Sequence, residues 1–360
     1  METPWGRLDT LDLSDHALAA DILGADKHQL LEGLVVECLF DQMLASLSQV
    51  CGHAVQALDV ESVVVDTQRQ NGRWVCFVWA RSMGPGLGRY LQALEKCMDP
   101  WLVTLDAGEF MACRVQEGRR QSSPMPLQEL MPELSGGRAT PYVVKTSVRD
   151  RARQLRAFWG FISDWHKDRL GERVVLPRLL INCGIQPYFR SVWNLDRVLV
   201  VGNQIWLLEI KHKFPMDREA LYFGINDGEL RLLDRLAGAD IRCLHTLLVK
   251  PWWSKEVGSM YLLNDLNARA RTAVIATVLD RAATAALLAS SSGRSGAHTS
   301  ITGASALQFK SLAATDFRVL GLLSEPRGVT AQMSSLMAGQ DVPAVEDHRL
   351  RGLRMHSHRF

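Results

Sequence analysis

Two carboxylates and a lysine occupy positions that a β-hairpin would bring together. Residues 194–213 contain two apolar runs separated by Gly-Asn at positions 202–203, a dipeptide typical of two-residue hairpin turns. If that dipeptide forms the turn, cross-strand partners have numbers that add up to 405, so Asp196 faces Glu209. Lys211 lies on the same face because side chains alternate along a strand. The sequence therefore predicts two carboxylates and one ammonium group close together.

Such a cluster is costly in a purely structural hairpin. Facing carboxylates repel each other, and both of these lie in aliphatic strands. A divalent cation would remove the repulsion. Carboxylate oxygens are hard ligands that suit Mg²⁺ or Mn²⁺, and the two side chains would have Cβ atoms roughly 5 Å apart. Glu-x-Lys alone is common as a solvated pair at the end of a strand. The metal-site interpretation therefore depends on Asp196 being aligned with Glu209.

The order of these residues resembles the PD-(D/E)XK nuclease superfamily over about residues 151–253. The resemblance consists of an Asp, a spacer of a dozen residues, and Glu-x-Lys at the end of an apolar strand. A helix with a glutamate precedes this pattern, and a helix–strand unit follows it. The resemblance implies a restriction-endonuclease-like αβββαβ core with a central mixed sheet. Leu195 stands where the name-giving pattern has proline.

The resemblance also implies a role for each site residue. Asp196 and Glu209 would bind the metal, with the Ile210 carbonyl as a third ligand. Lys211 would orient the attacking water or stabilise the developing charge. Glu172 is similar to the helix glutamate that often completes the metal site, and it is named here as a catalytic and metal-binding candidate. A glutamate early in a helix is also typical of a simple N-terminal charge, so the role of Glu172 stays open.

The implied activity is hydrolysis of phosphodiester bonds by a metal-activated water, as a DNA endonuclease with DNA favoured over RNA. The cations nearest the core are candidates for contacts with phosphates: Arg190, Arg197, His212 and Lys213. Two alternatives remain. The core could bind nucleic acid or a protein partner without cutting, or it could be a structural subunit of a larger complex. Cleavage of both strands would need two active sites, which makes a homodimer or a larger complex a further expectation.

The elements that would position these residues follow from periodicity and turn signals. A kink or joint is expected at Pro177, and Asn226 or Asp227 is expected to cap the following helix. His245 lies mid-strand among leucines and is interpreted as a buried structural histidine. The expected helices are residues 28–50, 89–98, 149–165, 168–182 and 227–237, and the expected strands are residues 61–67, 73–80, 101–105, 186–192, 195–201, 204–211 and 242–249.

Composition shifts divide the chain into four expected parts. These are an acidic N-terminal α/β domain at residues 1–117, a linker at 118–146, the nuclease domain at 147–264, and an Ala-rich helix with a flexible basic tail at 265–360. The first domain could be a degenerate copy of the second. Aligning its Asn-Gly at 71–72 with the turn at 202–203 would place Val65, Val78 and Ala80 at the positions of the site residues. An unrelated α/β domain is the alternative.

Charge separates the two halves of the chain. Residues 1–137 contain 10 Lys and Arg against 19 Asp and Glu, whereas the remainder contains 31 against 20. A polyanion is therefore expected to bind the second part. The seven cysteines form no Cys-x-x-Cys pair, and the sequence predicts neither a signal peptide nor a membrane-spanning helix. We expect a cytoplasmic protein with no membrane partner.

Overall fold

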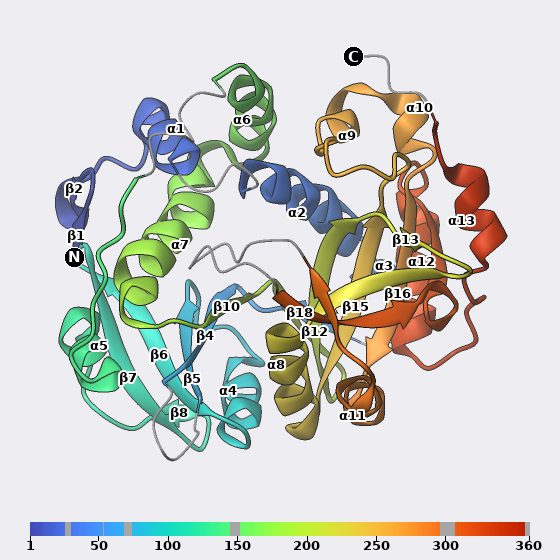
Figure 1. Ribbon diagram of the computed structural model, residues 1–360. Helices are drawn as coiled ribbons and strands as arrows, with labels where there is room; N and C mark the ends of the chain where they lie inside the picture. The colour runs from blue at the N-terminus through green and yellow to red at the C-terminus, as the bar shows by residue number, and fades with distance from the viewer. Residues whose placement is uncertain (26–29, 53, 68–73, 145–151, 296–306, 357–360) are drawn as a thin grey trace. The chain divides into compact units, whose positions relative to one another are not determined.

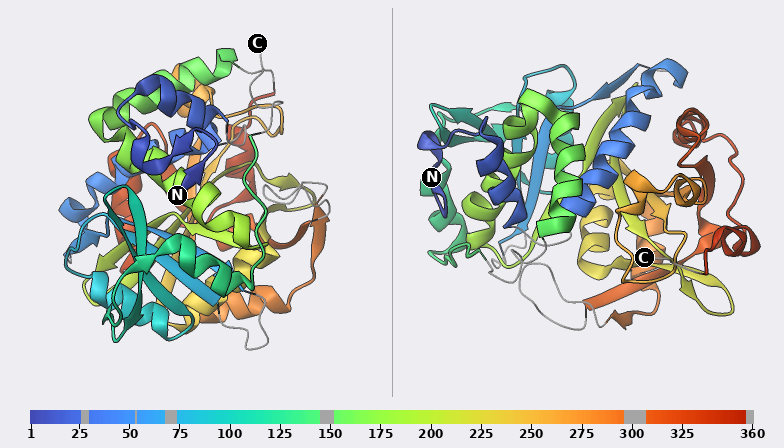
Figure 2. Two further views of the ribbon diagram at one scale, coloured as in Figure 1. Left: turned by 90° about the vertical axis from the view of Figure 1, so that its left-hand side faces the viewer. Right: turned by 90° about the horizontal axis from the view of Figure 1, so that it is seen from above.

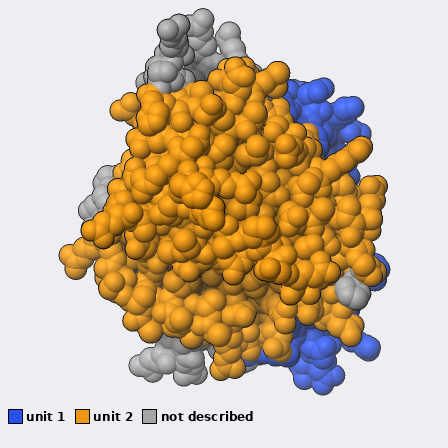
Figure 3. Space-filling model, turned by 90° about the vertical axis from the view of Figure 1, so that its right-hand side faces the viewer, with its two compact units in different colours: residues 1–31, 58–196 blue, residues 32–57, 197–360 orange. Residues whose placement is uncertain are grey.

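The chain passes between two units more than once. The computed structural model describes residues 1–25, 30–52, 54–67, 74–144, 152–295 and 307–356, and its architecture is mixed α/β (Figure 1). Unit 1 comprises residues 1–31 and 58–196, and unit 2 comprises residues 32–57 and 197–360 (Figure 3). Both units are thus discontinuous, whereas the division expected from the sequence is consecutive. Among the described residues, no helix has the length and apolar character needed to cross a membrane.

Unit 1 is built on a mixed sheet with strand order β10-β4-β5-β6-β7-β8, with β9 also paired to β7. Helix α1, helix α6 and the segment around α7 form a helical layer of this unit (Figure 2). Its strands are β1 (Glu2–Thr3), β2 (Gly6–Arg7), β4 (Val60–Asp66), β5 (Trp74–Ala80), β6 (Asp99–Asp106), β7 (Glu109–Gln116), β8 (Arg119–Arg120), β9 (Met125–Pro126) and β10 (Val192–Leu195). Its helices are α1 (His16–Gly24), α4 (Leu87–Glu95), α5 (Leu127–Ser135), α6 (Ala152–His166) and α7 (Leu176–Leu179).

Unit 2 contains a sheet with strand order β19-β16-β15-β12-β11-β3 and a smaller antiparallel sheet, β13-β14-β18-β17. Its strands are β3 (Val55–Ala57), β11 (Arg197–Val201), β12 (Gln204–Lys213), β13 (Met216–Asp217), β14 (Leu221–Asn226), β15 (Ile241–Val249), β16 (Ala273–Leu279), β17 (Gly293–Ser295), β18 (Leu307–Ala313) and β19 (Arg318–Leu322). Its helices are α2 (Leu30–Ala45), α3 (Leu47–Val50), α8 (Asp227–Gly238), α9 (Tyr261–Asn264), α10 (Leu266–Arg269), α11 (Arg281–Ala289), α12 (Pro326–Met337) and α13 (Asp347–Leu353).

The two main sheets have the same strand order and directions. In unit 1, β4 and β5 are antiparallel, α4 leads to β6 parallel to β5, and β7 is antiparallel to β6. In unit 2, β11 and β12 are antiparallel, α8 leads to β15 parallel to β12, and β16 is antiparallel to β15. A helical connection is the usual way to join parallel neighbours. Each unit thus has a hairpin, a crossover helix and two further strands.

The strand at the edge of each hairpin comes from the other half of the chain. Strand β3 directly precedes β4 in sequence but pairs antiparallel with β11 of unit 2. Strand β10 directly precedes β11 but pairs antiparallel with β4 of unit 1. The helix that precedes each of these strands belongs to the same unit as the strand, since α2 lies in unit 2 with β3 and α7 lies in unit 1 with β10. Two strands of similar position are therefore exchanged between the units.

Several local expectations are wrong, and each error has a physical reason. Residues 186–188 form a 3-10 helix, not a strand, since Pro187 has no backbone N–H to donate to a ladder. The helix expected at 168–182 is present but is divided into 3-10, π, α and π turns, and a change from π to α turn falls next to Pro177, where a joint is expected. The Ala-rich helix expected after residue 264 is limited to α11 (Arg281–Ala289). Residues 273–279 form the buried strand β16, because Val274, Ile275 and Thr277 favour extended backbone.

The N-terminal hairpin has a different register from the one assumed for a second copy. Strand β4 pairs with β5 so that Val65 faces Val75 and Val78 faces Ser62. Ala80 faces Val60, and the connection is longer than two residues. The Asn-Gly at 71–72 itself lies outside the described residues. The alignment that put Val65, Val78 and Ala80 at the positions of Asp196, Glu209 and Lys211 therefore has the wrong register, although the strand order of the two sheets agrees.

Segments expected to lack structure contain regular elements. The expected linker includes α5, whose Leu127, Leu130 and Met131 are buried. The expected tail includes β18, β19, α12 and α13, and α12 buries Val329 and Met333. These apolar positions lie three or four residues apart, which is the spacing of one helix face. Short amphipathic elements of this kind are easily missed in a region rich in Ser, Pro and Arg.

Candidate functional site

The central hairpin has the predicted register. Strands β11 and β12 pair from Arg197 with Leu208 to Val201 with Gln204, so partner numbers add up to 405. Gly202 in the turn has φ of 56°, the left-handed conformation that favours glycine in tight hairpins. The prediction of a two-residue turn at 202–203 is confirmed.

Asp196 lies at the point where the chain leaves one sheet for the other. It is the single residue between β10 and β11, and the β11–β12 ladder begins one residue later at Arg197. Asp196 belongs to unit 1 and Glu209 to unit 2. The predicted meeting of these two carboxylates therefore stays a prediction.

Within unit 2, three charged side chains converge on one face of β12. Glu209 is buried, and the Lys211 ammonium forms an ion pair with its Oε1 atom. The same Lys211 Nζ lies 3.4 Å from Oε1 of Glu229, a residue in the first turn of α8. Lys211 thus bridges a strand carboxylate and a helix carboxylate.

Local sequence explains why Glu229 reaches this position. Helix α8 starts directly after β14, and the Asn226 side chain caps it by accepting a hydrogen bond from the Gly228 N–H at 2.8 Å. Leu230 and Leu233 of the helix are buried in the unit. The cap predicted at Asn226 or Asp227 is confirmed at Asn226, and it fixes the helix start at Asp227, two residues before Glu229.

The field around Glu229 keeps it ionised. Burial raises the pKa of this carboxyl, but the charges of Lys211 and Lys213 outweigh burial and lower the pKa below its usual value. Lys213 lies on the same face of β12, two residues beyond Lys211, and donates a hydrogen bond to the Gly224 carbonyl at 2.7 Å. Burial lowers the pKa of Lys213. The face therefore carries a compact group of mutually dependent charges.

His245 borders this group on the neighbouring strand. It is the ladder partner of Glu209 between β12 and β15, so both side chains lie on the same face. His245 is 1% exposed, and neither ring nitrogen has a hydrogen-bond partner among the described residues. Burial lowers its pKa to about 3, so the ring is neutral at pH 7. The expectation of a buried histidine is confirmed.

The other candidate residues lie in different surroundings. Glu172 is exposed in a π-helical turn of unit 1 (Gly171–Val175). Arg190 is exposed in the same unit, and Ile210 is buried within β12 opposite Thr246. His212 hydrogen-bonds Tyr261 Oη at 2.7 Å, and burial lowers its pKa to about 3.

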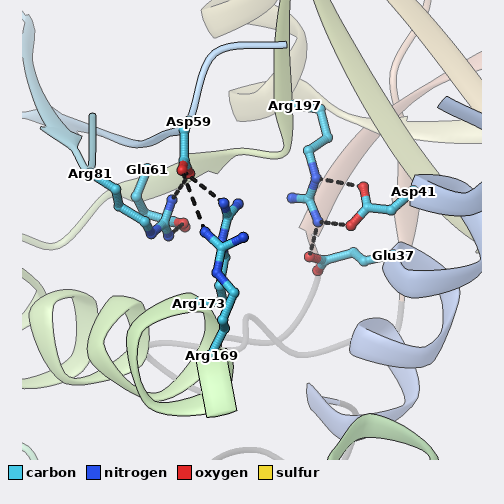
Figure 4. Close-up of polar contacts among 8 residues, drawn as sticks. All are labelled: Glu37, Asp41, Asp59, Glu61, Arg81, Arg169, Arg173 and Arg197. Atoms are coloured by element: carbon cyan, nitrogen blue, oxygen red, sulfur yellow. Dashed lines mark hydrogen bonds and ion pairs between the residues drawn. The ribbon is translucent and has the colours of Figure 1, made fainter. Parts of the chain in front are cut away.

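Arg197 is held by two carboxylates of α2. Its Nε lies 2.9 Å from Asp41 Oδ1, and one terminal nitrogen lies 3.0 Å from Asp41 Oδ2 and 3.3 Å from Glu37 Oε2 (Figure 4). Arg197 points to the opposite face from Glu209, since its ladder partner is Leu208. A contact between Arg197 and a phosphate would have to displace this bidentate pair.

A second charged group was missed by sequence reasoning and lies in unit 1. It consists of carboxylates beside β4 and arginines from β5 and the helical segment: Asp59, Glu61, Arg81, Arg169 and Arg173. A local signal existed in Asp-x-Glu at the start of one strand and an arginine directly after the next. The two helix arginines lie over 80 residues away in sequence, so their contribution had no local signal.

The carboxylates beside Lys211 are the candidate ligands for Mg²⁺ or Mn²⁺ in unit 2. Among the described residues, no group of three or more His, Cys, Asp and Glu side chains is arranged to hold a metal ion. Mg²⁺ is often held by only one or two carboxylates together with water and substrate phosphates. Glu209 and Glu229 are two such carboxylates, and the Lys211 ammonium now lies between them. Their chemistry fits a hard divalent ion if Lys211 moves aside.

Comparisons with known proteins identify no relative. No family model matches the sequence. No curated protein and no solved structure is significantly similar to the chain.

Proposed function

We propose that unit 2 hydrolyses phosphodiester bonds of nucleic acid, with DNA favoured over RNA. The observation that carries this proposal is the convergence of Glu209, Lys211 and Glu229 on one face of the hairpin strand. Strand order adds support. Taken together, α2, β3, β11, β12, α8 and β15 follow the αβββαβ order of a restriction-endonuclease-like core, with α2 and β3 supplied from the first half of the chain.

The proposed roles differ from those inferred by resemblance, because Glu229 joins Glu209 at the metal in place of Asp196 and Glu172, and Lys213 acts on Glu229 where the resemblance gave it a phosphate. Glu209 and Glu229 would hold Mg²⁺ or Mn²⁺, which supplies a Lewis acid and an activated water when bound. Glu229 replaces Glu172 as the helix carboxylate, because the helical segment with Glu172 belongs to unit 1. Lys211 would stabilise the negative charge that develops on the phosphate. Lys213 would keep Glu229 ionised, as its charge already lowers the pKa of that carboxyl.

One observation favours a second candidate function. The Lys211 ammonium already forms ion pairs with both carboxylates, which a protein that does not cut would also require. In that case unit 2 would be a noncatalytic module that binds nucleic acid or a protein partner. The two functions differ in whether Lys211 is needed for a chemical step.

Cleavage of supercoiled plasmid in Mg²⁺ or in Mn²⁺ tests the proposal. Wild type should nick or linearise the plasmid, and EDTA should abolish the reaction. Lys211→Ala should lower the rate at least about a hundredfold, as expected for loss of a group that stabilises transition-state charge. Lys255→Ala is the matched control, since Lys255 is exposed in the same unit. A wild type that binds but leaves plasmid, single-stranded DNA and RNA intact would refute hydrolysis and favour the noncatalytic module.

A further inference from the structure

The charged group of unit 1 is centred on two carboxylates and a buried arginine. Asp59 Oδ1 lies 3.2 Å from one terminal nitrogen of Arg81, and the other terminal nitrogen lies 3.1 Å from Glu61 Oε2 (Figure 4). Asp59 Oδ2 is 2.8 Å from Arg173, and Arg169 approaches the same oxygen at 4.0 Å. Asp59 is thus contacted by three guanidinium groups.

These contacts leave the group with surplus positive charge. Three arginines face two carboxylates, and the nearby Glu172 is exposed. The side chain of Arg81 is only 6% exposed, and its Nε atom is buried with no hydrogen-bond partner among the described residues. The guanidinium of Arg81 also lies 4.7 Å from the centre of the Trp79 ring. A buried donor without an acceptor is costly, and an oxyanion at this group would be a suitable acceptor.

The two helix arginines are accessible, unlike Arg81. The side chains of Arg169 and Arg173 are 55% and 32% exposed. Burial lowers the pKa of Arg173, and although Asp59 opposes this, Arg169 and Arg81 lower it further. An anion arriving from solvent would therefore meet two accessible guanidinium groups that repel each other. Binding would relieve this repulsion.

Backbone packing fixes the segment that carries both arginines. Arg169 ends a 3-10 turn (Lys167–Arg169) and Arg173 lies in the π-helical turn that begins at Gly171. A Cβ atom on Gly171 would lie 2.6 Å from the Leu13 carbonyl oxygen, so only glycine permits this close approach. The local helix irregularity is of a kind that is frequent at functional sites. The arginines are thus placed by a tightly packed backbone.

We propose that Arg81, Arg169 and Arg173 form an oxyanion site that binds a phosphate group. Planar guanidinium groups recognise phosphate through paired N–H donors, and this site offers more of them than Asp59 and Glu61 can accept. The bound phosphate would take the place of Asp59 at Arg169 and Arg173. The phosphate could belong to a nucleic-acid backbone or be free in solution, and the test separates these sources. This inference does not depend on hydrolysis at Lys211.

The test compares two double variants of equal charge change. Arg169→Gln/Arg173→Gln removes the accessible part of the site, and Arg119→Gln/Arg120→Gln removes two exposed arginines elsewhere in unit 1. Binding of a labelled single-stranded oligonucleotide is measured by fluorescence anisotropy at several salt concentrations, and binding of inorganic phosphate by calorimetry. The site variant should bind at least about tenfold more weakly with a salt slope reduced by about two, and the control within about twofold of wild type.

Each outcome decides the proposal. Loss of both ligands in the site variant alone supports a general phosphate site, and loss of only one ligand identifies the source of the phosphate. Equal effects in both double variants, or no binding of either ligand by wild type, would overturn it. The single variant Arg169→Gln guards against misfolding, because Arg169 is mostly exposed and its one ion pair within the described part of the chain is the 4.0 Å contact with Asp59. It should retain the wild-type unfolding midpoint and still weaken binding.

Discussion

The two units place different charges on the same strand order. In unit 2, the hairpin strand β12 carries Glu209 and Lys211, and a helix carboxylate completes the group. In unit 1, the corresponding strand β5 is followed by Arg81, and helix arginines complete the group. One arrangement has two carboxylates around a cation, and the other has arginines in excess over carboxylates. The same strand order can therefore carry different groups of charges, because the charged residues lie on a few strand ends and helix turns.

The largest expected effect on stability comes from removing the guanidinium of Arg81, at the centre of the charged group of unit 1. Arg81→Met leaves the partly buried Asp59 and Glu61 without their common partner, and breaking a buried pair costs about 3–5 kcal/mol. We expect a loss near the lower end of this range, since Arg173 still contacts Asp59. Urea unfolding followed by tryptophan fluorescence measures the loss.

The control for that change is Arg119→Met, an exposed arginine of the same unit. It should alter the free energy of unfolding by no more than about 0.5 kcal/mol. If Arg81→Met is equally mild, the unit 1 group is a solvated surface cluster. The contrast drawn between the two units would then fail.

Sequence reasoning succeeded where the information was local. The Gly-Asn turn at 202–203 determined the β11–β12 register, because a two-residue turn permits only one pairing. The Asn226 cap was equally local, and so was the boundary of α8. These features placed Glu209 and Lys211 on one face correctly.

Sequence reasoning failed where the partners are distant. Strands β3 and β10 are only three and four residues long, and nothing in them states which sheet they join. Their exchange between the units assigned the segment with Glu172 to unit 1. The expectation that Glu172 lies beside Glu209 therefore stays a prediction. The arginine group likewise depends on tertiary contacts between Asp59 and residues over 100 positions away.

The buried histidine of unit 2 should make its stability depend on pH. An unfolded histidine binds a proton near pH 6.5, whereas burial delays protonation of His245 to about pH 3. The unfolded state therefore binds more protons in this window, and stability falls as pH decreases from 6.5 toward 3. Replacement by leucine in His245→Leu should remove this dependence. As the pH falls through this window, the free energy of unfolding of the variant should rise relative to that of wild type by roughly 1 kcal/mol per pH unit.

Unfolding midpoints between pH 7 and pH 4 measure this effect. His348→Leu is the matched control, because the side chain of His348 is 81% exposed. A constant difference between His245→Leu and wild type over this range would mean that His245 takes up its proton near pH 6.5 in the folded protein too, so that it is charged below that pH. The group around Glu209 would then carry one more positive charge, and its contrast with the arginine-rich unit 1 would shrink.

The smallest expected effect concerns the turn that sets the register of the unit 2 site. Gly202 has φ of 56°, where an L-residue is disfavoured by about 1 kcal/mol, so Gly202→Ala should lower stability by about that amount. Gly238→Ala is the control, because Gly238 ends helix α8 with open space around its Cα and should be neutral or slightly stabilising. The hairpin of unit 1 has a longer connection, so the comparison predicts that only unit 2 depends on a tight turn. If Gly202→Ala also reduces plasmid cleavage well beyond its loss of folded protein, the turn positions Glu209 and Lys211 for catalysis. If cleavage only follows the folded fraction, the ladder with β15 is sufficient to hold them.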